Sequence, residues 1–154
     1  IAKKELLEKS NPDLPNILKY DAHANEGSML NTPNTFGWYV AGKMFDWHLE
    51  NGGVAEMEKQ SVAKTAMLYD LIDKSDFYLN PVNPEQRSIN NVVFTIVNSE
   101  LEKVFLEEAE KADLRYLKGH RTVGGMRASI YNSMKMESVS ALKDFMESFE
   151  KNYG

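Results

Sequence analysis

The sequence contains no cysteine, and it has no long hydrophobic run. The absence of thiols excludes a disulfide framework, a thiolate metal site and a cysteine nucleophile within these residues, and it suits a reducing compartment. No apolar segment approaches the roughly 20 residues that a membrane-spanning helix needs, and the first residues lack the apolar core of a signal peptide. We therefore expect a soluble cytoplasmic protein without a membrane partner.

An excess of positive charge is also missing, since the formal net charge is −5 and the isoelectric point is near 5.3. Broad nucleic-acid binding requires many Lys and Arg side chains to neutralise phosphates, so no nucleic-acid partner is expected. A local cationic pocket is still compatible with this charge. The P-loop, G-x-G-x-x-G and G-x-S-x-G motifs are absent as well, which removes the most specific nucleotide-binding and hydrolase signatures.

The sequence does have enough apolar residues, 42% of 154, to form one core of ordinary domain size. It starts with "IAKKELLEKS", a charged amphipathic turn that resembles the continuation of a longer helix-containing segment. We expect the chain to be a fragment of a longer protein.

Two long helices are predicted in the first half of the chain. Residues 11–33 hold three of the five prolines and the turn-like "NEGS", so an irregular connector is expected there. Residues 35–50 carry Phe36, Val40, Met44 and Trp47 at helical spacing, and Gly52-Gly53 ends the run. A second helix is expected over residues 54–73, with Lys and Glu outside and an inner face of Met57, Ala63, Ala66, Met67, Leu71 and Ile72.

The second half alternates strand and helix patterns. "INNVVFTIV" (89–97) is rich in β-branched residues and predicts a strand, and Ser99 with Glu102 forms a capping-box pattern that opens a helix to about Lys111. Residues 115–117 and 127–131 are short strand candidates. A final helix ending at Gly154 is marked by Val139, Leu142, Phe145, Met146 and Phe149. This order predicts a small α+β sandwich with helices on one face of a mixed or antiparallel sheet.

The stretch "KGHRTVGGMRASIYN" (118–132) carries the clearest chemical signal. His120, Arg121 and Arg127 surround Gly124-Gly125. A guanidinium can hold a carboxylate or a phosphate through two charge-assisted hydrogen bonds, and Arg127 lies between flexible glycines and a strand that would fix its direction. The alternative is that these are surface cations paired with some of the 23 acidic residues. The pattern alone leaves both interpretations open.

The segment "SMLNTPNTF" (28–36) is a weaker candidate. Asn31, Thr32 and Thr35 precede the first long helix, and a helix N-terminus can bind phosphate. Spacing alone favours ordinary helix capping by these side chains. His23 and His48 have no metal-ligand spacing, so no metal site is predicted. The eight methionines and both tryptophans are interpreted as core filling.

Three segments, "NTPNTF", "NGGVAEME" and above all "KGHRTVGGMRASIYN", resemble the C-terminal part of phosphoserine aminotransferases, a fold-type I family that uses pyridoxal 5'-phosphate (PLP). The resemblance runs through essentially all 154 residues. It implies reversible amino transfer between glutamate and 3-phosphohydroxypyruvate, yielding 2-oxoglutarate and phosphoserine, in serine biosynthesis. It also implies a cytoplasmic homodimer with shared active sites and, in bacteria, a related step of pyridoxine (vitamin B6) biosynthesis.

The resemblance assigns roles to individual residues. Arg127 matches the arginine that holds the substrate α-carboxylate. His120 and Arg121 match the pair that meets the distal phosphate, or the side-chain carboxylate of glutamate, from the neighbouring subunit. Asn31 and Thr32 match positions that contact the PLP phosphate across the dimer interface, which replaces the capping interpretation for this segment and leaves capping to Thr35.

The resemblance also has a gap, because the family's Schiff-base lysine, the Asp that pairs with the pyridine nitrogen and the aromatic ring stacked on PLP all match positions before Ile1. We therefore expect residues 1–52 to be the end of the large PLP-binding domain with the connector into the interdomain helix. Residues 53–154 should be the small C-terminal α+β domain, and the fragment alone should be inactive.

Rival interpretations differ in what they require. Cysteine desulfurases need a persulfide-forming cysteine, which is absent here. Other small-acid transaminases have no use for a second cationic group at His120 and Arg121. A non-catalytic α+β module that binds a phosphorylated metabolite, or that only dimerises, stays open as the alternative from a different class.

Overall fold

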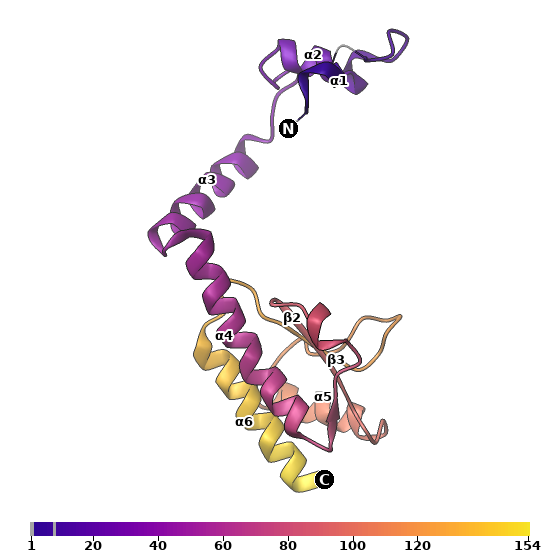
Figure 1. The fold of residues 1–154 in the computed structure, drawn as a ribbon, viewed down its shortest axis with the longest axis vertical. Helices are drawn as coiled ribbons and strands as arrows, with labels where there is room; N and C mark the ends of the chain where they lie inside the picture. The colour runs from indigo at the N-terminus through magenta and orange to yellow at the C-terminus, as the bar shows by residue number, and fades with distance from the viewer. Residues whose placement is uncertain (1, 8) are drawn as a thin grey trace. The chain divides into compact units, whose positions relative to one another are not determined.

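The computed structural model describes residues 2–7 and 9–154, and the chain divides into two compact units, residues 1–47 and 48–154 (Figure 1). The first unit contains α1 (Lys4–Leu7), the 3₁₀ turn η1 (Asn16–Leu18), α2 (Tyr20–Asn25) and most of α3 (Thr35–Glu50). The second contains α4 (Gly53–Lys74), β1 (Tyr78–Leu79), η2 (Pro84–Gln86), β2 (Asn91–Ile96), α5 (Leu101–Lys111), β3 (Met126–Ser129) and α6 (Met136–Tyr153).

The predicted irregular connector over residues 11–33 is partly wrong, because it includes the helix α2 and the turn η1. Its prolines flank residues 16–25 and do not interrupt them, so ten consecutive residues without proline or glycine are available for helical turns. Local hydrogen bonds support the turns: Lys19 Nζ donates to the carbonyl of Pro12 at 2.8 Å, and His23 Nε2 lies 2.9 Å from the carbonyl of Ile17.

The predicted helix over residues 35–50 is confirmed as α3, but its cap is a different residue from the one expected. The side-chain oxygen of Asn34 accepts a hydrogen bond from the backbone N–H of Gly37 at 3.0 Å, so Asn34 caps the helix and Thr35 is its first residue. A Cβ added at Gly37 would lie 2.7 Å from Asn34 Nδ2, so a larger residue there would push the cap away.

The prediction that the tryptophans and methionines fill a core is wrong for α3. No residue of this helix is buried by the rest of the described chain, and its exposed apolar side chains include Phe36, Trp38, Val40, Met44, Phe45 and Leu49. These residues occupy more than one side of the helix, a pattern that is typical of helices covered on several sides. Burial needs a facing apolar surface, and the described residues of the first unit supply none for these side chains.

A three-stranded antiparallel sheet, in the order β1-β2-β3, organises the second unit. In β2 the side chains alternate, so that Val92, Phe94 and Ile96 are buried while the residues between them are half-buried. Of the two predicted alternatives, a mixed or an antiparallel sheet, the antiparallel one is correct, because both strand pairs are antiparallel. β1 has only two residues, too few for a periodic pattern, and it was not predicted.

The predicted strand over residues 115–117 is wrong. Tyr116 has φ +63°, a left-handed conformation that an extended strand does not contain. The pairing in this region is an isolated bridge between Lys118 and Met126. The strand predicted at 127–131 is confirmed as β3, which begins one residue earlier and ends two residues earlier than predicted.

Three helices cover the buried face of the sheet. α4 and α6 run side by side in the same direction (Figure 1), as the bonds from Lys64 to Met134 and from Ser75 to Glu150 also require. α5 packs on β2. The core between them is rich in aromatic rings: Phe105 makes edge contacts with Tyr78, Phe94, Phe145 and Phe149 at centroid distances of 5.0–6.2 Å. The Tyr78 hydroxyl donates to the carbonyl of Met146 at 2.8 Å, and burial raises its pKa.

Two helix details differ from expectation. In α4 the predicted inner residues Ala63 and Ala66 are exposed, and the buried face consists of Met57, Ser61, Lys64, Thr65, Leu68 and Ile72. At α5 the expected capping box does not form: the Asn98 side chain accepts from the N–H of Glu100 at 3.2 Å, while Glu102 N–H bonds the main-chain oxygen of Ser99. Asn98 starts this turn one residue before the predicted cap.

Candidate functional site

The predicted cationic stretch folds into a hairpin between Leu117 and Met126. Gly119 N–H donates to the carbonyl of Gly125 at 2.8 Å, and the N–H of Gly124 donates to the carbonyl of His120 at the same distance. Gly125 has φ +61°, and a Cβ there would lie 2.7 Å from Thr95 Cγ2 and 2.8 Å from the carbonyl oxygen of Phe94. The glycines are therefore required for the hairpin to pass close to β2.

His120 and Arg121 lie at the exposed tip of this hairpin. The backbone N–H of Thr122 points to Nδ1 of His120 at 3.3 Å, and the Thr122 hydroxyl lies 2.7 Å from the same atom. Since an N–H can only donate, Nδ1 is an acceptor, and a neutral His120 ring carries its proton on Nε2. That leaves Nε2–H as a donor for an external acceptor.

A cavity of about 500 Å³ lies beside the hairpin tip. Its walls include His120 and Arg121 together with Lys103 of α5 and Lys118 at the base of the hairpin. Glu102 is the acidic residue among them. The excess of cationic side chains makes this cavity suited to a multiply charged anion such as a phosphate group. The contributions of Lys103 and Lys118 were not predicted, although Lys118 belongs to the same sequence stretch.

Arg127 belongs to β3, and its backbone is positioned by Leu117 on one side and by β2 on the other. Its N–H donates to the carbonyl of Leu117 at 2.7 Å, and across the sheet it is in register with Val93 of β2. The side chain is half-buried, and its Nε atom is buried without a hydrogen-bond partner among the described residues. A guanidinium with such an uncommitted N–H can accept a carboxylate, since Nε–H and a neighbouring Nη–H form one of its two-pronged faces.

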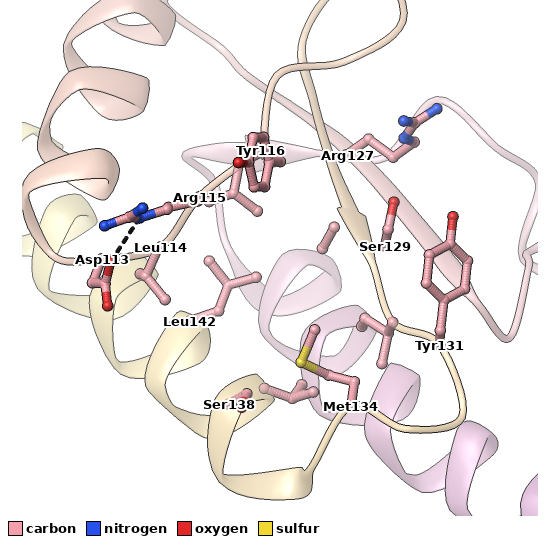
Figure 2. A pocket seen from close by; sticks show the side chains of 14 residues that line it. Asp113, Leu114, Arg115, Tyr116, Arg127, Ser129, Tyr131, Met134, Ser138 and Leu142 are labelled. Atoms are coloured by element: carbon pink, nitrogen blue, oxygen red, sulfur yellow. Dashed lines mark hydrogen bonds and ion pairs between the residues drawn. The ribbon is translucent and has the colours of Figure 1, made fainter.

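Arg127 lines a second cavity of about 530 Å³, formed by residues 113–117, β3 and the start of α6. Its floor is apolar, with Leu114, Val139 and Leu142, and Figure 2 shows the Arg127 side chain pointing away from Leu142 and Met134. On the same side of the strand as Arg127 lie Ser129 and Tyr131 (Figure 2). Arg115 also lines this cavity but is bound to Asp113, with its Nε 2.7 Å from the carboxylate.

The structure therefore does not bring the three predicted anion-binding side chains of the second unit together. His120 and Arg121 line one cavity and Arg127 lines the other. Two separate anionic groups, one at each cavity, would match this arrangement.

Asn31 and Thr32 lie in an irregular segment of the first unit before α3. Both are exposed, and within residues 2–7 and 9–154 neither side chain has a hydrogen-bond partner, because Asn34 performs the capping. An amide and a hydroxyl in this state offer donors of the kind that bind a phosphate oxygen. Their predicted contact with a cofactor phosphate stays a prediction.

The described part of the chain contains no group of three or more His, Asp or Glu side chains that could hold a metal ion. None of its described helices combines the length and the apolar content of a membrane span.

Comparisons with known proteins give a consistent result. Residues 3–142 match the family model described as aminotransferase class-V. The chain is 51% identical over all 154 residues to phosphoserine aminotransferase of Acinetobacter baylyi, of which it covers 43%. Solved structures of phosphoserine aminotransferases are similar too. The enzyme from Bacillus circulans subsp. alkalophilus has a TM-score of 0.92 at 39% identity, covering 99% of this chain and 43% of that one. The PLP-bound enzyme from Trichomonas vaginalis has a TM-score of 0.83 at 34% identity, covering 94% and 42%. The chain thus spans less than half the length of these relatives.

Proposed function

The chain belongs to the class-V aminotransferase family, and we propose that the whole protein is a phosphoserine aminotransferase that transfers an amino group reversibly between glutamate and 3-phosphohydroxypyruvate in serine biosynthesis. The related step of pyridoxine biosynthesis, a homodimeric state and a cytoplasmic location belong to the same proposal. No nucleic-acid or membrane partner is included in it.

The observation that carries this proposal is the division of the cationic side chains between two cavities. Phosphoserine carries an α-carboxylate at one end and a phosphate at the other. In a dimer with shared sites, Arg127 of one subunit holds the α-carboxylate, and His120 with Arg121 of the other subunit hold the distal phosphate or the second carboxylate of glutamate. Two anchoring points fix the substrate in one orientation, which is how positioning lowers the activation barrier.

The cofactor of the proposed enzyme is pyridoxal 5'-phosphate. When bound, it supplies an electron sink for the carbanion that forms at the substrate α-carbon. Asn31 and Thr32 would bind its phosphate through the uncommitted amide and hydroxyl described above, from across the dimer interface. The donor chemistry fits, because neither group is used for capping α3.

A substrate series with the complete protein tests the proposal. Arg127→Lys removes the two-pronged contact to the α-carboxylate and should raise KM for every amino-acid substrate by about 10-fold to 100-fold, the equivalent of one charged hydrogen-bond contact. Arg115→Lys is a matched control, because Arg115 lines the same cavity but is already paired with Asp113. It should leave KM unchanged.

Substitution of His120 or Arg121 by Ala should instead impair phosphoserine far more than alanine, which has no distal anion. Equal losses for both substrates would contradict the assignment of the phosphate to this hairpin. A wild-type protein that binds phosphoserine but transfers no amino group would favour the non-catalytic binding module.

A further inference from the structure

Lys64 is a lysine in the core of the second unit. It lies on α4 and is only 2% exposed, yet it has no ion pair with any described acidic residue. Its Nζ atom donates to three backbone carbonyls of one loop: Met134 at 2.9 Å, Tyr131 at 3.0 Å and Asn132 at 3.4 Å. An ammonium group has three N–H donors, so its hydrogen-bonding capacity is used in full. Burial also lowers the pKa of Lys64.

A charged group at such a position is costly, because burial removes its hydration without a compensating opposite charge. A methionine or leucine of similar size would fill the same space without that cost. The ammonium does one thing that an apolar side chain cannot do, which is to gather three carbonyl oxygens of residues 131–134. Its neighbour on α4, Ser61, lies 3.5 Å from the side-chain oxygen of Asn132, so the same helix contacts the loop twice.

The loop held by Lys64 is the direct continuation of the strand that carries Arg127. Side chains alternate along a strand, so Arg127, Ser129 and Tyr131 lie on one side of the chain (Figure 2). The start of this row is fixed by the bond from Arg127 N–H to Leu117, and its middle by pairing with β2. The last backbone hydrogen bond of this row is donated by Ile130 N–H to the carbonyl of Asn90, the residue before β2, at 2.7 Å. After Ile130, the backbone carbonyls are held by Lys64.

Arg127 depends on this support, because its own side chain contributes little to its position. Its Nε is buried without a partner in the part of the chain that the structure describes, so no side-chain hydrogen bond through that atom fixes the guanidinium. Tyr131, which lines the same cavity and is 60% exposed, is held through the carbonyl that accepts from Lys64. The geometry of the cavity rim therefore follows the backbone of residues 127–134.

We propose that Lys64 is a positioning residue for the cavity that Arg127 lines. Its ammonium fixes the backbone of Tyr131 and the end of β3, so that Arg127 meets the substrate α-carboxylate in the correct place. This inference rests on the proposed function of Arg127. It extends that function to a residue on another helix that does not itself touch the substrate.

The test compares Lys64→Met with Lys59→Met in the complete PLP-loaded enzyme. Lys59 is the matched control, since it lies on the same helix with a side chain that is 79% exposed. We expect Lys64→Met to raise KM for glutamate, phosphoserine and alanine by the same factor, about tenfold, because a small displacement of a binding group weakens each of them alike. We expect kcat to change less than twofold and Lys59→Met to behave as wild type. Calorimetric titration with 2-oxoglutarate should show the same loss in equilibrium binding.

A merely structural role has a different signature. If Lys64→Met lowers the thermal midpoint while KM and 2-oxoglutarate binding stay at wild-type values, the inference is overturned. If Lys64→Met does not fold, Lys64→Gln keeps a donor at the same place and should show an intermediate rise in KM; wild-type KM in that variant would also contradict the inference. A wild-type protein that binds 2-oxoglutarate but transfers no amino group would refute the proposed function alone, and weaker binding by Lys64→Met would still support the role of Lys64.

Discussion

α3 is more apolar than α6, with 9 apolar residues of 16 against 8 of 18, yet only α6 buries side chains. α6 places Val139, Leu142, Met146 and Phe149 in the core of residues 48–154. α3 buries no side chain, and no described residue of the first unit is buried. The difference shows that apolar periodicity determines which residues can be covered, whereas the presence of a facing surface determines whether they are.

The same difference separates the candidate functional residues. Arg127 stands on a strand whose backbone is fixed by the core of its own unit, by Leu117 and by β2. Asn31 and Thr32 lie in an irregular segment of a unit in which no described residue is buried. The position of the proposed substrate contact at Arg127 should therefore be fixed within the second unit, while the positions of the proposed cofactor contacts should depend on other protein surfaces.

The largest expected effect is the loss of the aromatic core. In the 154-residue chain, Phe105→Ala should lower the free energy of unfolding by about 3–5 kcal/mol, because Phe105 is fully buried among four aromatic rings. The corresponding change in α3, Phe45→Ala, removes a side chain that is 67% exposed and should cost less than about 0.5 kcal/mol. Urea denaturation measures both. Similar losses in the two variants would contradict the contrast between the units.

The next contrast compares the effect on stability of replacing one glycine in each unit by alanine. Gly125→Ala forces an alanine into φ +61° and places its Cβ against Thr95 and Phe94, so it should destabilise the second unit by about 1–3 kcal/mol. Gly42→Ala adds a Cβ with nothing within 4 Å in the middle of α3. It should stabilise that helix by about 0.5–1 kcal/mol. Thermal unfolding followed by circular dichroism measures the sign of both stability changes. A loss of stability in Gly42→Ala would reveal a surface that covers α3.

Helix capping should matter more where packing is absent. Asn34→Ala removes the bond to Gly37 N–H and should weaken the first turn of α3 by about 1 kcal/mol. Amide hydrogen exchange should accelerate at Gly37 by about fivefold, the equivalent of that free energy. Asn98→Ala removes the comparable contact at Glu100, but buried Phe105 and Ala109 hold α5. Exchange in the middle of α5 should stay unchanged, and faster exchange throughout it would be inconsistent with this explanation.

The smallest expected effect is electrostatic. Arg87 donates two hydrogen bonds to Asp73, at 2.6 and 2.7 Å, and these bonds together with the guanidinium charge hold the pKa of Asp73 below its ordinary value of 3.8. Because the folded pKa lies below the unfolded one, this stabilisation is complete above the unfolded pKa and is lost as pH falls through the folded pKa. Asp73 is about half exposed, so screening limits its contribution to less than about 1 kcal/mol.

Asp73→Asn should therefore flatten the acid side of a plot of unfolding free energy against pH. Asp46→Asn in α3 is the control, because its contact with Lys43 is longer, at 3.7 Å, and both side chains are 64% exposed. It should leave the plot unchanged. An unaltered acid slope in Asp73→Asn would refute the assigned role of the Arg87 contact.

Sequence patterns predicted the long elements well, because α3, α4 and α6 have periodic apolar residues and clear ends. They failed where one residue decides the local structure. Tyr116 in a left-handed conformation ends the expected strand at 115–117, and β1 is too short to have a period. Lys64 was assigned to the outer face of its helix, since a lysine is exposed in most contexts and nothing nearby in sequence indicates the three carbonyls that receive it.

The main residues of the candidate site were predictable from the sequence, but their division between two cavities was not. Glycines beside His120, Arg121 and Arg127 indicated anion binding, and the resemblance to a known family divided these residues into two roles. Spacing alone could not have done so, because the five residues between Arg121 and Arg127 are compatible with either one pocket or two. The hairpin closed by Gly119 and Gly125 is what directs them into different cavities.

The central claim is that the side chains proposed to bind the substrate lie on a unit with a core of its own, whereas the described residues of the first unit form none. Urea denaturation of residues 51–154 produced alone tests it most directly. We predict one cooperative transition, with a free energy of unfolding within about 1 kcal/mol of the value for the corresponding transition in the 154-residue chain. A broad, non-cooperative loss of helical signal from residues 51–154 would contradict the claim.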